Sequence, residues 1–87
     1  MYLHIGQETV VAMREIVGIF DMENTTISKN TRVFLNEAQQ RGQVITVGDD
    51  LPKSFIVCQK GEGPPTVYIS QISCATLLKR AESLRSN

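Results

Sequence analysis

Short hydrophobic runs, most of them rich in valine and isoleucine, are separated along the chain by polar segments. Runs of β-branched residues bounded by turn-forming residues are typical of β-strands. The pattern therefore predicts six strands, at residues 2–5, 9–11, 16–20, 44–47, 55–59 and 66–70.

Residues 12–15 join the second and third predicted strands and must change direction, although they include neither glycine nor proline. Those two residue types are the usual signals of a turn. The sequence leaves open whether this segment is a tight turn or part of one bent strand.

Two helices are predicted, and a serine precedes each of them as a candidate cap. Ser28 precedes a helix over residues 29–41, and Gly42 stands where a helix commonly ends. Ser73 precedes a second helix that continues to about residue 84. The apolar stripe of the first helix is short, whereas the second helix carries Leu77, Leu78, Ala81 and Leu84.

The connections at residues 48–52 and 60–65 have the glycine, proline and aspartate content of turns. Short connections favour antiparallel neighbours, because a parallel crossover needs a dozen or more residues. The sequence therefore predicts one α+β domain over residues 1–87, in the order β-β-β-α-β-β-β-α. We expect a small antiparallel sheet of five to six strands with two helices.

The composition is that of an ordinary globular domain, with 41% apolar and 21% charged residues. No apolar run is long enough to span a membrane, and no segment resembles a secretory signal, so we expect a cytoplasmic protein without membrane contact. A domain of 87 residues has a thin core. It devotes Phe20, Phe55 and Leu78, among others, to burial, and its sheet edges invite pairing with a second copy.

Nine basic and nine acidic side chains give a formal net charge of zero. Acidic residues are in excess up to residue 28, and basic residues are in slight excess after it. Such a protomer has no strong field that attracts phosphate. Binding to nucleic acid would require that the bases be gathered on one face or multiplied by oligomerisation.

Residue types that perform catalysis or bind metals do not form a recognisable group in the sequence. His4 is the single histidine and has no ligand partners at the spacing of a metal site. Asp49 and Asp50 lie in a predicted turn, and the glycines of residues 61–65 lack the Lys-Ser or Lys-Thr of a phosphate loop. We predict no catalytic residue, no metal and no cofactor, and thus a binding protein rather than an enzyme.

The two cysteines are predicted to be reduced structural thiols. Cys58 lies within a predicted strand, where a small buried residue is expected. Cys74 lies at the start of the second helix, a position that can lower the pKa of a thiol. A thiol-dependent enzyme built on Cys74 and His4 is the weakest interpretation of the sequence.

Five segments, taken in order, resemble one known family. They are residues 1–6 (MYLHIG), 10–11 (VV), 14–21 (REIVGIFD), 52–57 (PKSFIV) and 73–81 (SCATLLKRA). Together they resemble the RemA/RemB family of extracellular-matrix regulators, and most closely its RemB branch. The resemblance covers nearly the whole chain.

The resemblance implies a DNA-binding transcriptional regulator of extracellular-matrix and biofilm genes, with a fold similar to the LytTR type. It also implies assembly into rings that present basic residues to double-stranded DNA. Weak phosphate contacts from each subunit would then add. By the same resemblance, Arg14 corresponds to an arginine that contacts DNA.

The sequence departs from the family in the loop before the fifth predicted strand. RemA-like proteins carry an arginine pair there, whereas this chain has Leu51-Pro52 after Asp49-Asp50, and Lys53 is the one base nearby. Lys29 and Arg32 on the first helix are candidate substitutes for the missing phosphate contacts. Each of these bases could instead be an ordinary solvated charge.

The second helix is the predicted subunit interface of a homo-oligomer. Leu77 and Leu84 supply its apolar part, and Arg80 supplies a salt bridge to an acidic residue of a neighbouring subunit. The alternative function is that of an oligomeric paralogue that has lost DNA binding and acts as a partner or scaffold. It would assemble with a more basic paralogue, and the zero net charge favours this alternative.

Overall fold

Six strands and two α-helices follow one another in the order β-β-β-α-β-β-β-α, which confirms the predicted α+β fold class. The computed structural model describes residues 1–23 and 28–85. In chain order the elements are β1 (Tyr2–Gly6), β2 (Thr9–Ala12), the 3-10 helix η1 (Met13–Glu15), β3 (Ile16–Asp21), α1 (Lys29–Gln40), β4 (Val44–Val47), β5 (Ser54–Cys58), β6 (Thr66–Ser70) and α2 (Cys74–Arg85).

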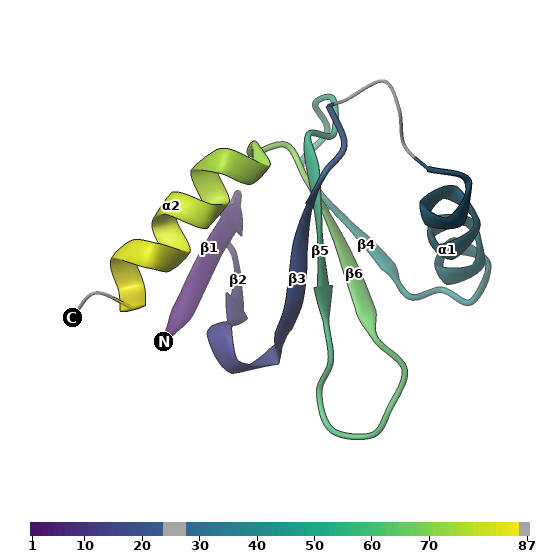
Figure 1. Cartoon of the computed structure of the whole chain (residues 1–87), viewed down its shortest axis with the longest axis horizontal. Coiled ribbons are helices and arrows are strands. Elements are labelled where there is room, and N and C mark those ends of the chain that lie inside the picture. Colours follow the sequence, from purple (N-terminus) through teal and green to yellow (C-terminus); the bar gives the residue numbers. More distant parts are fainter. Residues whose placement is uncertain (24–27, 86–87) are drawn as a thin grey trace.

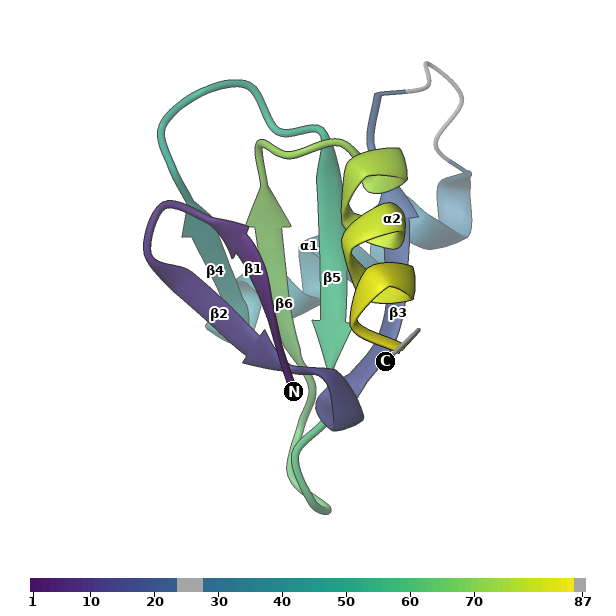
Figure 2. The same ribbon diagram turned by 90° about the vertical axis from the view of Figure 1, so that its left-hand side faces the viewer.

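The strands form two sheets rather than one. β1 and β2 make an antiparallel hairpin, and the other strands form a four-stranded sheet in the order β3-β5-β6-β4. The hairpin and α2 lie beside each other over one side of the four-stranded sheet, and α1 lies on the opposite side (Figures 1 and 2). None of the described helices is long and apolar enough to cross a membrane.

β5 is the central strand, and all five of its residues are buried. Successive side chains of a strand point to opposite faces, so β5 supports a core on each side. Phe55 and Val57 pack with Ala38 and Val67 beneath α1. On the other face, Ile56 and Cys58 join the core formed with the hairpin and α2, which also contains Leu3, Ile5, Val11, Val47 and Leu77.

The expected antiparallel pairing of residues 44–47 with the next strand is wrong. β5 pairs with β3 on one edge and with β6 on the other, both antiparallel, so neither edge of β5 is left for β4. β4 therefore pairs with β6 in parallel, with Val44 opposite Val67 and Val47 opposite Ser70. Residues 48–53 must then pass over the end of the sheet, because β6 lies between β4 and β5.

The segment after β2 is a short 3-10 turn, which answers the question that the sequence left open. Ala12 and Ile16, on either side of η1, have extended backbone. The Met13 N–H donates to the Met1 carbonyl at 2.9 Å, and the Gln59 N–H donates to the Glu15 carbonyl at 2.8 Å. η1 is therefore tied both to the start of the hairpin and to the end of β5.

Both predicted helix caps are present. The Ser28 hydroxyl accepts a hydrogen bond from the Thr31 N–H at 3.2 Å, and the Ser73 hydroxyl accepts one from the Thr76 N–H at 3.2 Å. Gly42 adopts a φ of 71°, which a residue without a side chain tolerates best. α1 ends one residue earlier than predicted, with Arg41 as its C-cap.

Two buried serines join the layers of the protein. Ser54 and Ser70 lie opposite each other on β5 and β6, and neither has exposed surface. The Ser54 hydroxyl donates to the Ile72 carbonyl at 2.7 Å, and the Ser70 hydroxyl donates to the Ile5 carbonyl at 2.6 Å. The Ile72 N–H in turn donates to the Ser70 hydroxyl at 3.0 Å. These bonds connect the sheet to β1 and to the segment that leads into α2.

We expect Ser70→Ala to lower the free energy of unfolding by about 1–3 kcal/mol, because the buried partners of the hydroxyl lose their hydrogen bonds. Urea unfolding followed by circular dichroism measures this. Ser83→Ala, the same change at an exposed position of α2, is the control and should stay within about 0.5 kcal/mol. Equal stabilities for the two variants would contradict the role given to Ser70.

Candidate functional site

Arg14 is exposed on η1, at the end of the sheet where β3 begins and β5 ends. The hydrogen bonds of Met13 and Glu15 hold the backbone on either side of it. Lys60, also exposed, follows Gln59, whose N–H binds the Glu15 carbonyl. This hydrogen bond therefore joins the residue after Arg14 to the residue before Lys60. Lys60 has no local signal in the sequence, because only the pairing of β3 with β5 brings residues 15 and 59 together.

Lys53 lies at the opposite end of the same strand pair. Its N–H donates to the Ser70 carbonyl at 2.8 Å, and its carbonyl accepts from the Met22 N–H at 2.9 Å. Along β5, six residue steps separate Lys53 from Gln59, which corresponds to roughly 20 Å at about 3.3 Å per residue. The structure therefore does not bring Arg14 and Lys53 into one patch of a single protomer.

The loop before Lys53 carries the two carboxylates that the sequence places in a turn. Asp49 and Asp50 are exposed. The Asp50 N–H donates to the Gln71 side-chain oxygen at 3.1 Å, and the Asp50 carboxylate accepts from the Leu51 N–H at 2.9 Å. Two carboxylates therefore precede the one base of this loop, and hydrogen bonds of Asp50 and Leu51 hold the loop backbone in place.

Lys29 and Arg32 are exposed at the start of α1, on the side of the sheet away from α2 (Figure 1). They thus lie on a different element from both Arg14 and Lys53. The four bases that the sequence suggested as phosphate contacts are spread over three parts of the surface.

The predicted interface residues of α2 have different environments. Leu77 has no exposed surface, so the prediction that it contacts a neighbouring subunit needs correction: it belongs to the core of its own protomer. Arg80 donates to the His4 carbonyl at 3.1 Å, and Leu84 is half-buried beside β1. Leu78, expected in the core, is 47% exposed.

Both thiols have pKa values raised above the ordinary value, which disfavours the reactive thiolate. Burial, with a smaller contribution from the Glu15 carboxylate, raises the pKa of Cys58 to about 11. Burial and then the Asp21 carboxylate raise the pKa of Cys74 as well, although the start of a helix is a position that can lower the pKa of a thiol. Among residues 1–23 and 28–85, no three His, Cys, Asp or Glu side chains gather as metal ligands.

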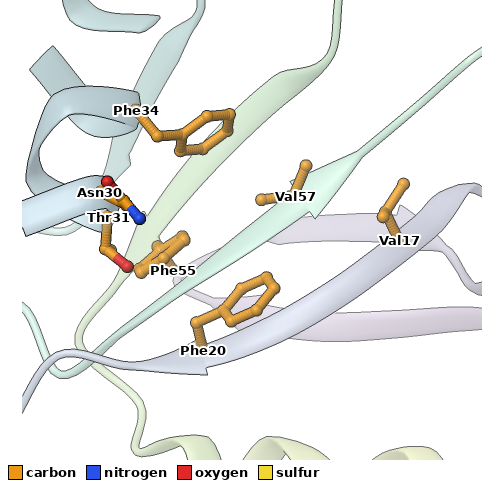
Figure 3. Close-up of a pocket in the computed structure, with 7 residues that line it drawn as sticks. All are labelled: Val17, Phe20, Asn30, Thr31, Phe34, Phe55 and Val57. Carbon is orange, nitrogen blue, oxygen red and sulfur yellow. The ribbon is translucent and has the colours of Figure 1, made fainter. Parts of the chain in front are cut away.

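An apolar groove lies between α1 and the β3–β5 pair (Figure 3). Its volume is about 330 Å³, and its lining consists of Val17, Phe20, Phe34, Phe55 and Val57 with Asn30 and Thr31 of α1. The Phe20 and Phe55 rings stack with their centroids 4.8 Å apart. Phe20, expected in the core, is 44% exposed. A Cβ at Gly18 would lie 2.6 Å from the Phe20 ring, so the absent side chain makes room for that ring.

Comparison with known proteins identifies relatives of nearly full length. The RemA-like family model, described as extracellular matrix regulatory protein A-like, matches residues 2–81. The extracellular matrix regulatory protein B of Bacillus subtilis (strain 168) is 37% identical over 82 residues. That alignment covers 94% of this chain and 91% of the relative.

Leu77→Ala should lower the free energy of unfolding by about 2–5 kcal/mol, because it leaves a cavity in the core between α2 and the sheet. Leu78→Ala, one residue later on the exposed side of α2, should change it by no more than about 0.5 kcal/mol. Thermal or urea unfolding of the two variants compares them. Similar losses at both positions would mean that α2 is rotated about its axis relative to this structure.

At pH 8 both thiols should react with iodoacetamide much more slowly in the folded protein than in urea. Their pKa values are raised, so the reactive thiolate is scarce in the folded state. Mass spectrometry of timed samples measures the alkylation of each cysteine. Alkylation of native Cys74 as fast as in the unfolded chain would contradict this assignment and would reopen the question of a reactive thiol.

Proposed function

The chain belongs to the RemA-like family of extracellular matrix regulatory proteins, and from this we propose that it acts as an oligomeric DNA-binding regulator of matrix genes in the cytoplasm. In this proposal basic side chains of each subunit contact the phosphates of double-stranded DNA. The observation that carries it is the family match over residues 2–81, which includes the fixed and exposed Arg14.

Arg14 with Lys60 is the pair best suited to phosphate. Both are exposed, and a backbone hydrogen bond joins Glu15, the residue after Arg14, to Gln59, the residue before Lys60. A base on a fixed backbone loses less conformational entropy on binding than one on a mobile loop. Lys53 is a weaker candidate, because the carboxylates of Asp49 and Asp50 in the same loop oppose phosphate. Lys29 and Arg32 are also weaker candidates, because they lie apart from Arg14, on α1.

The charge balance supports the proposal that the protein assembles. A protomer of zero net charge with two suitable bases makes too few phosphate contacts for stable binding. A ring or other homo-oligomer repeats the pair in every subunit, and the contacts add. A protein with six to ten phosphate contacts loses roughly 10³–10⁵ in affinity between 50 and 200 mM salt, so salt dependence reports how many subunits take part.

A gel-shift titration at 50 and 200 mM salt, on material whose mass is fixed by light scattering, tests the proposal. The wild-type multimer should bind DNA, with a steep loss at the higher salt. Arg14→Glu should weaken binding at least tenfold without changing the mass, because it replaces a phosphate contact by a repulsion in every subunit.

Lys79→Glu is the matched control, since it makes the same charge change at an exposed position of α2. It should leave the affinity within about twofold of the wild type. Loss of binding in Lys79→Glu but not in Arg14→Glu would move the DNA contact to α2 and refute the assignment to η1.

The alternative function is that of an oligomeric paralogue that no longer binds DNA. The carboxylates of Asp49 and Asp50, in the loop where the family carries an arginine pair, favour it. A wild-type multimer that fails to shift DNA at 50 mM salt would refute the regulator proposal. Co-purification with a more basic member of the family would then identify its partner.

A further inference from the structure

The groove beside α1 exposes apolar side chains that the protomer itself does not cover. Val17 is 67% exposed, Phe20 44% and Phe34 38%. Its volume of about 330 Å³ is near the lower limit of the ~300–1,000 Å³ typical of binding pockets. It suits one or two protruding side chains better than a large ligand.

Leu51 is the most exposed large hydrophobic residue of the described chain, at 77%. Hydrogen bonds from its own N–H to Asp50 and from the Asp50 N–H to Gln71 hold the loop in position. Pro52, next in the chain, restricts the backbone further. Leu51 is therefore presented to solvent on a prepared backbone, which lowers the entropy lost when it binds.

Leu51 and the α1 end of the groove each have charged residues nearby, and these charges are of opposite sign. Asp49 and Asp50 directly precede Leu51, and both are exposed. Lys29 is exposed on α1, directly before Asn30 and Thr31 of the groove lining. The first turn of α1 contains no acidic residue that would repel an incoming carboxylate. The acidic loop thus has an apolar tip, and the apolar groove has Lys29 at its α1 end and Asp21 after Phe20 at its β3 end.

We propose that Leu51 of one copy of this chain inserts into the groove of a second copy, with the Asp49–Asp50 carboxylates facing Lys29. This inference rests on the oligomer of the proposed function and assigns the surfaces that join it. The tip and the groove are different parts of the protomer, so a contact made once per pair of subunits is head-to-tail. Repeated contacts of this kind close into a ring or continue as a filament, according to the rotation between subunits.

Light scattering of the wild type, Leu51→Ser and Phe34→Ser over a range of concentrations tests the contact. Both substitutions lie at exposed positions, and circular dichroism verifies that the variants fold. We expect each to raise the concentration needed for half-assembly at least tenfold. Leu78→Ser, the same loss of an exposed apolar side chain on α2, is the matched control and should assemble as the wild type does.

Mixing provides a stricter test of the head-to-tail geometry. Leu51→Asp retains an intact groove, and Phe34→Asp retains an intact Leu51. Each alone should be monomeric, whereas an equimolar mixture should give a complex of two chains and nothing larger. The charge swap Lys29→Asp with Asp49→Lys should restore the assembly that Lys29→Asp alone weakens.

The outcomes separate this contact from the proposed function. A multimeric wild type whose mass survives Leu51→Ser and Phe34→Ser would refute the contact and leave the oligomer intact. The same holds if only Leu78→Ser dissociates, since the interface would then lie on α2. A wild type that is monomeric at every concentration would refute both the contact and the oligomeric regulator.

Discussion

The hydrogen bonds of two buried serines determine how the layers of this protein fit together. Hydroxyl groups without exposed surface must find partners, because an unpaired polar group in the interior is costly. Ser70 finds its acceptor on β1, and Ser54 finds its acceptor on the segment before α2. The hairpin and α2 are thereby fixed against the four-stranded sheet. The position of η1 depends on the same arrangement, since the Met1 carbonyl of the hairpin accepts from Met13.

Local sequence signals made the helices and strands predictable. Which strands pair with each other depended on which of them occupy the two edges of β5. Ser28, Gly42 and Ser73 mark helix ends through bonds within a few residues, so the sequence contains that information directly. The parallel pairing of β4 with β6 has no local signal in the sequence. It follows from the two antiparallel neighbours that occupy both edges of β5.

The sequence was sufficient to name candidate basic residues of the site. It was not sufficient to predict where these residues lie relative to one another. Arg14 was expected to be exposed at a bend, and it is. The separation of Arg14 from Lys53, at opposite ends of the strand pair, could not be inferred, because it requires the register of β3 with β5. Both Leu77 and Leu78 belong to the predicted apolar stripe, but only Leu77 is buried, since a helical stripe does not specify which of two adjacent leucines faces the core. The pKa of Cys74 is raised by burial and by the Asp21 carboxylate, although the thiol lies at the start of a helix.

Residues 48–53 cross over the end of the sheet as an exposed loop. The side chains of this loop can therefore change without changing the stability of the fold. Its backbone is held mainly by groups outside it, the Gln71 side chain and the Ser70 carbonyl, while its side chains stay in solvent. Substitutions at residues 49, 51 and 52 therefore alter a surface without disturbing either core. After gene duplication, such a loop can acquire a new partner through a few codon changes, and sister proteins that share one scaffold can diverge in what they recognise.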